Sequence, residues 1–394
     1  MWIEREIQPL LTTIAQQRPA IIVTGCRQAG KTSVLRHAFP DYHYVSLDLP
    51  NQAQEAEESG AQFLQRHPAP LIVDEVQYAP QLLRYVKNAI DQQRDRNGLY
   101  LLTGSQKFAL MQGVTESLAG RVAVLDCHSL SVAELERWSG KTAEGAQLLD
   151  WIVHGGYPEL HAKSLDPQRF YADYLVTYLE RDVRQVLQVK SLRDFDRFMR
   201  LVAIRTGQLL SYSSYASDLG VSPNTVKSWI SVLEASNVVR LLEPYYSNIG
   251  KRLVKTPKLY MLDTGLACYL AGIRSPNDLR QSALLGAFFE THVMGQIVRW
   301  YSNRGLTPSV FYYRDHHGHE VDFVVAVGEK LKLIECKWSE TPPSNLKGFE
   351  QVARQLGEKN VLSRSVITPA RGYRTLKHLA MDDSVELRSL TEQT

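Results

Sequence analysis

The stretch that decides the fold runs from Ile21 to Thr32 and reads IIVTGCRQAGKT. Its β-branched start favours a strand, the spacing Gly-x-x-x-x-Gly-Lys-Thr follows, and residues 33–38 then favour a helix. Backbone N–H groups of such a loop converge on the helix N-terminus, where they and the helix dipole favour a polyphosphate. Gly25 and Gly30 permit backbone angles and a close approach that a Cβ would block. The stretch therefore predicts a phosphate-binding loop between a strand and a helix.

A second motif supplies the acids that such a loop requires. Residues 70–75 read PLIVDE, an apolar strand that ends in two carboxylates. Lys31 would reach the β- and γ-phosphates of a nucleotide, and the Thr32 hydroxyl would ligate Mg²⁺. Asp74 would hold the same Mg²⁺, usually through water, and Glu75 would take the proton of the attacking water. Together the two motifs predict a site that binds and hydrolyses ATP with Mg²⁺.

Two further positions could serve this site. Residues 99–106 read as a strand that stops at small polar residues, so Ser105 or Gln106 could hold the attacking water. A plain helix cap is the alternative for these residues. Arg121 could stabilise charge in the transition state, in its own subunit or in a neighbouring one, or could be an ordinary surface arginine. The role in a neighbouring subunit would require a homo-oligomer.

The composition sets broad limits. A chain of 394 residues is long enough for two or three domains, and 44% hydrophobic with 22% charged residues is typical of a soluble globular protein. The net charge of +3 does not indicate nucleic acid by itself. The N-terminus has acids where a signal peptide has basic and apolar regions, and no run approaches the roughly 18 apolar residues of a membrane span. A cytoplasmic protein without a membrane segment is expected, and its four scattered cysteines argue against disulfides and zinc.

Hydropathy patterns divide the chain into four segments. Residues 1–130 alternate strands and helices and predict a mainly parallel sheet covered on both faces. Residues 131–205 read as a helical lid or linker, 206–275 as a winged helix, and 276–394 as a small α/β domain. The predicted fold class is therefore α/β, with a P-loop NTPase sheet, a helical and winged-helix segment, and a C-terminal α/β domain. The strands expected in the first segment are residues 20–23, 43–47, 71–73, 99–102 and 122–126.

The winged-helix prediction depends on two short helices joined by a tight turn, residues 213–219 and 223–235. Three side chains of the second helix would face DNA: Asn224, Thr225 and Lys227. Residues 248–258 carry four cations and no acid, and this loop could grip phosphates. Helix-turn-helix units also serve as structural or protein-binding modules, and short basic loops are commonly just solvated, so both interpretations stay open.

A second chemical signal lies in the C-terminal segment. Residues 318–337 read GHEVDFVVAVGEKLKLIECK, a β-hairpin with a two-residue turn at 328–329. This turn fixes the register so that Asp322 lies directly opposite Glu335, at a separation of about 5 Å. Carboxylates this close repel each other unless a cation or a proton lies between them. Strand alternation predicts one apolar face, formed by Val321, Phe323, Val325, Ile334 and Cys336.

A divalent metal would satisfy the two opposed carboxylates. With Mg²⁺ on Asp322 and Glu335, and Lys337 orienting a metal-bound water, the hairpin would be a phosphodiesterase centre. The spacing Asp, twelve residues, Glu-x-Lys is similar to that of the restriction-endonuclease-like nucleases, and Glu290 is similar to their additional acid on a helix. The alternative is a neutralised surface face, in which Lys337 pairs with Glu320 and Asp322 is solvated.

The order of motifs resembles a family, the prokaryotic AAA-type ATPases that carry a C-terminal domain of unknown function. The resemblance covers nearly the whole chain and implies an ATP-binding core, a winged-helix segment and a nuclease-like end. It does not imply a defined substrate. The matching residues are 25–32 with an arginine at Arg27, Asp74-Glu75, 103–105, 118–121, 155–158, 178–182, 258–260, 263–266 and Glu335-x-Lys337.

The sequence thus predicts an ATPase coupled to a nuclease-like end that acts on nucleic acid, with DNA as the expected partner. The rival hypothesis is a nucleotide-gated switch or regulator whose C-terminal domain binds a partner without catalysis. The expected catalytic residues are Lys31, Glu75 and Lys337. The expected nucleotide-binding residues are Gly25, Arg27, Gly30, Lys31, Thr32, Ser33, Asp74 and Ser105. The expected metal ligands are Thr32 and Asp74 at the first site and Asp322, Glu335 and Glu290 at the second.

Overall fold

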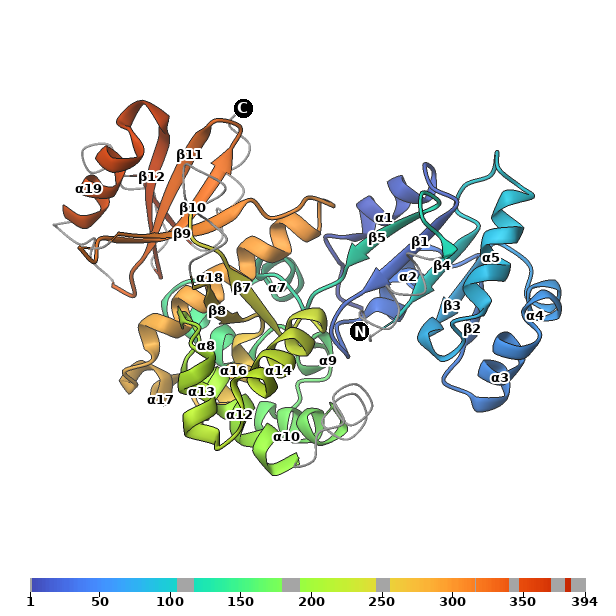
Figure 1. Cartoon of the computed structure of the whole chain (residues 1–394), viewed down its shortest axis with the longest axis horizontal. Coiled ribbons are helices and arrows are strands. Elements are labelled where there is room, and N and C mark those ends of the chain that lie inside the picture. The colour runs from blue at the N-terminus through green and yellow to red at the C-terminus, as the bar shows by residue number, and fades with distance from the viewer. Residues whose placement is uncertain are drawn as a thin grey trace.

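The N-terminal part of the protein is a parallel sheet between two layers of helices (Figure 1). The computed structural model describes residues 2–104, 117–178, 192–245, 256–315, 317–339, 347–369 and 380–383. The sheet has the order β2-β3-β4-β1-β5, and all its pairings are parallel. Its strands are β1 Ala20–Thr24, β2 His43–Ser46, β3 Leu71–Asp74, β4 Tyr100–Thr103 and β5 Val122–Asp126. The predicted strands and α/β class are therefore confirmed.

Alternate residues of β1 point to opposite faces of the sheet, and each face packs against its own layer of helices. Ile21 and Val23 pack with α1 and α2, whereas Ala20 and Ile22 pack with α4 and α5 on the opposite face. The strand is fully buried, as strands in the middle of parallel sheets are. The helices of this part are α1 Gln8–Ala15, α2 Lys31–Ala38, α3 Pro50–Glu58, α4 Gly60–Arg66 and α5 Leu82–Asp91, with the 3-10 turn η1 Val76–Tyr78.

Helices dominate the middle of the chain and share one large apolar core with the start of the protein. Ile3, Cys26 and Ala29 belong to this core, so the phosphate loop rests on the helical part. A three-stranded sheet of order β6-β8-β7 adjoins α13 and α14. The elements are α7 Val132–Ser139, α8 Gly145–His154, α9 Pro158–Ala162, α10 Pro167–Tyr178, α12 Leu192–Ile204, β6 Gln208–Leu209, α13 Tyr212–Leu219, α14 Pro223–Ala235, β7 Val239–Leu242, β8 Lys258–Met261, α16 Thr264–Leu270 and α17 Pro276–Gln281.

The predicted helix-turn-helix pair is present as α13 and α14, and Ser222 caps α14 with its hydroxyl. Asn224 and Lys227 are exposed on this helix, and Thr225 is half-buried. Its function as a winged helix that reads DNA stays a prediction. Most of the basic loop lies outside the described residues, in 246–255. Its last cation, Lys258, is buried in β8, so this one lysine cannot grip phosphates as predicted, while the prediction for the rest of the loop stays untested.

The C-terminal part is a mixed sheet of order β13-β12-β11-β10-β9, with a helix on each face. The hairpin register is as predicted, since Val327 pairs with Lys330 and Phe323 with Ile334. The elements are α18 Leu285–Ser302, β9 Val310–Arg314, β10 Glu320–Val327, β11 Lys330–Cys336, α19 Lys347–Leu356, η3 Glu358–Asn360, β12 Val361–Thr368 and β13 Ala380–Asp383.

The predicted single apolar face of the hairpin is wrong in two respects. Both faces are buried, because α18 covers one and α19 covers the other. Val321 packs on the α19 side with Val324, whereas Phe323 and Val325 pack into the large helical core. A register irregularity in the β9 pairing lies between Val321 and Val324 and breaks the alternation there. Among the described residues, we find no helix long and apolar enough to cross a membrane.

Candidate functional site

The phosphate loop has the backbone that its glycines allow. Gly25 and Gly30 adopt φ angles of 142° and 91°, in the region that residues with a Cβ rarely enter. A Cβ on Gly25 would lie 2.0 Å from the carbonyl oxygen of Cys127, which follows β5. The loop is therefore held between α2 and the end of β5, at the carboxyl edge of the sheet.

Lys31 and Thr32 open α2 and point to different partners. The Lys31 ammonium donates to the carbonyls of Gly25 (3.1 Å) and Cys26 (2.9 Å), so it lies over the loop. The Thr32 hydroxyl donates to Asp74 Oδ1 at 2.7 Å. This bond joins the two motifs that the sequence predicted to form one site.

Two residues that sequence reasoning missed also hold Asp74. The Thr103 hydroxyl at the end of β4 donates to Asp74 Oδ1, and the Tyr44 hydroxyl of β2 donates to Oδ2 at 3.0 Å. Burial and the Asp74 charge raise the pKa of Tyr44 to about 12. Because β4 lies beside β3, the rule that pointed to Ser105 at this strand end could also have found Thr103. Ser105 and Gln106 themselves lie outside the described residues.

Glu75 has a left-handed backbone, with φ 54°, directly after β3. Its N–H donates to the Thr103 hydroxyl (3.2 Å), and Gln77 Nε2 donates to Glu75 Oε2 (2.5 Å). Glu75 lines the cleft beside the loop. The predicted base is therefore at the phosphate loop.

A cleft of about 620 Å³ opens beside the loop. It receives Arg27, Lys31, Thr32, Ser33 and Glu75, and so brings most of the predicted nucleotide residues together. The rest of its lining comes from the N-terminal segment, the loop, α9 and α10: Trp2, Ile3, Arg5, Gln28, Gly30, Pro158, Glu159, Ala162, Lys163, Tyr174 and Thr177. Arg121 is directed elsewhere, because its guanidinium binds the Asp91 carboxylate at 2.8 and 3.1 Å.

The second predicted site also comes together, between the hairpin and α18. The backbone N–H of Cys336 donates to Asp322 Oδ2 at 2.8 Å, and Lys337 lies 2.7 Å from Glu335 Oε1. Burial first, and then the charges of Glu290 and Glu335, raise the pKa of Asp322 well above its usual range. Burial also raises the pKa of Glu335, against the opposing effect of Lys337. The predicted surface alternative is wrong, because Asp322 is 8% exposed and Lys337 pairs with Glu335 instead of Glu320.

Lys258 is an unpredicted member of this cluster. Its ammonium lies 3.1 Å from Glu290 Oε1 and 2.5 Å from Glu320 Oε1, and the Tyr260 hydroxyl donates to the same Glu290 oxygen (2.5 Å). Burial alone would lower the pKa of Lys258, but Glu290, Asp322 and Glu320 raise it above its ordinary value, so the residue is charged. Lys258, which lies in β8, therefore neutralises part of the negative charge of the cluster. It precedes its partner Glu290 on α18 by 32 residues in the chain.

Two carboxylates of the cluster fit a divalent metal. Glu335 Oε2 is buried without a hydrogen-bond partner, and Asp322 faces it across the hairpin, so these two carboxylates fit a cation. Among the described residues, no three His, Cys, Asp or Glu side chains are grouped to hold a metal ion. Mg²⁺ keeps several waters and needs only one or two carboxylates, so Asp322 and Glu335 are sufficient to bind it. Glu290 Oε1 already accepts hydrogen bonds from Lys258 and Tyr260.

Comparison with known protein families agrees with the first site. Residues 17–136 match the AAA domain family. In fold and in site, residues 17–136 are therefore similar to a P-loop ATPase domain of the AAA type. Residues 145–277 and 285–380 match two domains of unknown function, DUF8612 and DUF4143.

Similar full-length proteins include uncharacterized proteins from Mycobacterium tuberculosis and Mycobacterium bovis. Each is 29% identical over 343 residues, which cover 86% of this chain and 74% of the relative. Similar solved structures include the Walker-type ATPase PABY2304 of Pyrococcus abyssi, at 16% identity and a TM-score of 0.46, covering 68% of this chain and 96% of that one. The AMPPCP-bound DnaA of Aquifex aeolicus is similar at 15% identity and a TM-score of 0.28, covering 58% and 85%.

Proposed function

We propose that this protein binds Mg-ATP in the cleft beside the phosphate loop and hydrolyses it. The observation that carries the proposal is the hydrogen bond between Thr32 and Asp74, because it joins the loop and the acid strand in one site. Mg²⁺, when bound, would offset the phosphate charge and polarise the transferring phosphoryl group.

The residues have distinct roles in this proposal. Lys31 exchanges its two carbonyl acceptors for phosphate oxygens, which adds a positive charge where negative charge accumulates. Thr32 and Asp74 would hold the metal, and Thr103 and Tyr44 orient Asp74 through hydrogen bonds. Glu75 accepts the proton of the attacking water from the side of the cleft. Arg27 and Ser33 line the same cleft and would contact the phosphates of a bound nucleotide.

The change Glu75→Gln tests the hydrolysis. It should keep nucleotide affinity within about twofold and lower the turnover by at least about 100-fold, the usual range for a lost general base. Glu58→Gln, on the exposed end of α3, is the matched control and should change neither quantity. Undiminished turnover in Glu75→Gln would remove Glu75 from its role.

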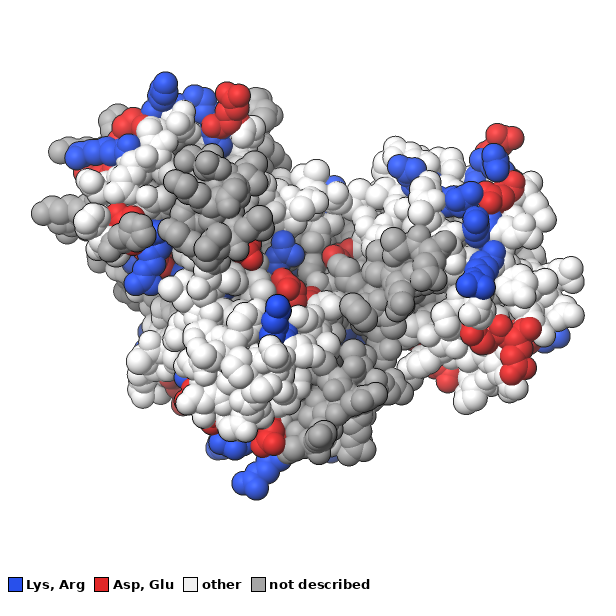
Figure 2. Space-filling view, viewed as in Figure 1, with Lys and Arg blue, Asp and Glu red and all other residues white. Residues whose placement is uncertain are grey.

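For the C-terminal cluster we propose metal-dependent hydrolysis of phosphodiesters in nucleic acid, with DNA as the substrate. The support is the unpartnered Glu335 oxygen opposite Asp322, with Lys337 beside it to orient a water. On the face drawn in Figure 2, the Lys and Arg side chains of the described residues lie in small groups next to Asp and Glu. Among the described residues, this face therefore offers no continuous basic path for a nucleic acid.

The nuclease proposal is tested with labelled single- and double-stranded DNA in Mn²⁺ or Mg²⁺. Wild type should cut, and Asp322→Asn and Lys337→Ala should each lose at least about 100-fold in rate. Lys330→Ala is the control, because Lys330 begins β11 at the end of the hairpin far from Lys337. Among the hydrogen bonds of the described residues, its ammonium donates to the Lys359 carbonyl. Equal rates for wild type and Asp322→Asn would end the nuclease proposal.

The second candidate function is a nucleotide-gated switch whose C-terminal domain binds a partner without catalysis. Lys258 favours it, because this buried cation already neutralises Glu290 and Glu320 without a metal. Under this candidate, Mn²⁺ would not bind the hairpin, and Asp322→Asn would leave every nucleic-acid assay unchanged.

A further inference from the structure

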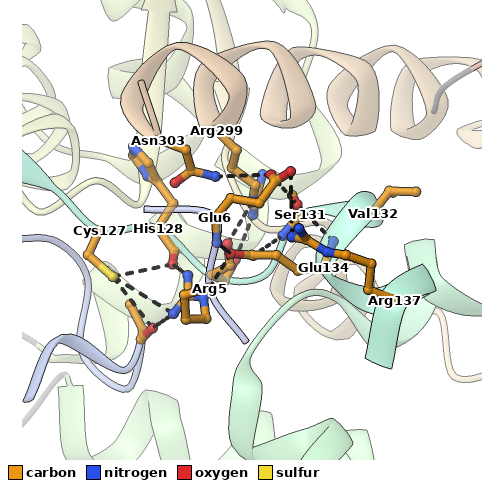
Figure 3. A network of polar contacts seen from close by, with 12 residues as sticks. Arg5, Glu6, Cys127, His128, Ser131, Val132, Glu134, Arg137, Arg299 and Asn303 are labelled. Carbon is orange, nitrogen blue, oxygen red and sulfur yellow. Dashed lines mark hydrogen bonds and ion pairs between the residues drawn. The ribbon is translucent and has the colours of Figure 1, made fainter. Parts of the chain in front are cut away.

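Arg5 lines the cleft beside the phosphate loop, is only 4% exposed, and belongs to a segment to which the sequence analysis assigned no function. Its three guanidinium nitrogens have three different acceptors. Nη1 donates to the Ala29 carbonyl (2.8 Å), Nη2 to the His128 carbonyl (2.6 Å) and Nε to Glu134 Oε1 (3.0 Å). Figure 3 shows these bonds converging on the guanidinium from separate parts of the chain.

The bond to Ala29 acts on the loop itself. A trans peptide unit is planar, and its C=O and N–H point in opposite directions. The Ala29 carbonyl and the Gly30 N–H belong to one such unit, so holding the carbonyl at Arg5 directs the Gly30 N–H away from Arg5. A Cβ on Gly30 would lie 3.3 Å from Arg5 Nη1, which shows how closely the guanidinium backs this glycine. The direction of loop N–H groups decides how well the loop binds phosphate.

Glu134 holds Arg5 in turn. Its side chain is fully buried, and Oε1 also accepts from the Glu6 N–H (2.6 Å). Oε2 accepts from the Ser131 N–H (2.7 Å), which completes the capping box at the start of α7. Every bond that fixes this carboxylate comes from the backbone or from Arg5, so the anchor is rigid. A buried charge pair of this kind keeps its geometry only while both partners are present.

We propose that Arg5 is a positioning residue for the nucleotide: it fixes the peptide between Ala29 and Gly30, and Glu134 anchors it. The inference rests on the proposed nucleotide site. The loop is then ordered before phosphate arrives, so little of the binding energy is spent on ordering it. The same network connects the loop to α18, because Glu6 accepts from Ser131 Oγ (2.9 Å) and Asn303 Nδ2 (3.3 Å).

The chain offers a matched control in Arg299, which is 5% exposed. Arg299 also makes three hydrogen bonds, to the Ser129 carbonyl (3.0 Å), Ser129 Oγ (2.6 Å) and the Leu262 carbonyl (2.9 Å). Its acceptors lie outside the phosphate loop. Arg5→Lys and Arg299→Lys therefore each remove buried hydrogen bonds, and only the first removes one from the loop.

The experiment measures the dissociation constants of ADP and of a non-hydrolysable ATP analogue by calorimetry, together with KM, kcat and the thermal midpoint of each full-length variant. Arg5→Lys should raise both dissociation constants at least about tenfold, and KM should rise more than kcat falls. Arg299→Lys should lower the thermal midpoint by a similar amount and keep both dissociation constants within about twofold. Unchanged affinity in Arg5→Lys, or an equal loss in both variants, overturns the proposal.

If Arg5→Lys does not fold, Glu134→Gln replaces it, because this change keeps Arg5 and the side-chain volume. It should raise the dissociation constants at least about threefold, and unchanged affinity overturns the proposal. If wild type and Arg5→Lys bind nucleotide equally well, only this inference is contradicted. A wild type that binds no nucleotide contradicts the proposed function as well.

Discussion

Replacing Asp322 by asparagine should stabilise the protein in the absence of metal, although most changes at buried positions destabilise. Asn has the same shape and can still accept the N–H of Cys336, but it removes one of two opposed carboxylates. At a pH above the raised pKa of Asp322, where both carboxylates are ionised, two unit charges about 5 Å apart repel by about 3 kcal/mol at an effective dielectric constant of about 20. Lys337 and Lys258 offset part of this repulsion, so we expect a net gain of about 1–2 kcal/mol.

Thermal unfolding in EDTA, followed by circular dichroism, measures the gain. Asp322→Asn should raise the midpoint by about 2–4 °C per kcal/mol gained. Mn²⁺ at 100 times its dissociation constant should then stabilise wild type by about 2.7 kcal/mol and raise its midpoint accordingly, and it should not shift the midpoint of Asp322→Asn. Glu329→Gln, in the exposed turn of the same hairpin, is the control and should behave as wild type in both conditions. A lower midpoint for Asp322→Asn in EDTA, with an equal Mn²⁺ response in both proteins, would refute the reasoning.

Three further predictions test other parts of the structure. Gly25→Ala should abolish nucleotide binding because its Cβ would lie 2.0 Å from the Cys127 oxygen, whereas Gly120→Ala, with φ 78° and open space around it, should cost about 1 kcal/mol of stability and leave binding intact. Thr103→Val should lower stability by about 1–3 kcal/mol and slow ATP turnover, because the buried hydroxyl holds both Asp74 and the Glu75 N–H; unchanged turnover would show that this orientation of Asp74 is dispensable. Burial lowers the pKa of His292 to about 3, so the folded protein resists protonation of this residue and its free energy of unfolding falls as the pH drops below about 6.5. Denaturant titrations should show that His292→Gln removes about 1.4 kcal/mol of the stability lost between pH 7.5 and 5.5. Identical pH dependence in both proteins would contradict this.

Local signals explain why much of the fold could be predicted. Strand β1, the loop after it and α2 follow from adjacent residues, since β-branched residues, two glycines and helix formers each act on their own backbone. The hairpin register followed from its two-residue turn, which determines every pair as far as Phe323 and Ile334. These are short-range constraints, so one sequence is sufficient to find them.

The contacts that sequence reasoning missed are long-range. Lys258 stands in a run of cations that reads as a solvated loop, but α18 and β10 bury it against Glu290 and Glu320. Arg5 reaches Glu134 across 129 residues, and no local pattern marks either residue. Val321 departed from strict alternation because the pairing of β10 with β9 is irregular, which depends on the neighbouring strand.

The central claim is that the loop at residues 25–32 and the two acids at the end of β3, Asp74 and Glu75, form one Mg-ATP site. Calorimetric titration of a non-hydrolysable ATP analogue, with and without Mg²⁺, into wild type and Lys31→Ala tests it most directly. We predict one site per chain in wild type, tighter binding with Mg²⁺, and a loss of at least about tenfold in affinity in Lys31→Ala. Binding that is absent in wild type, or equally tight in Lys31→Ala, would contradict the claim.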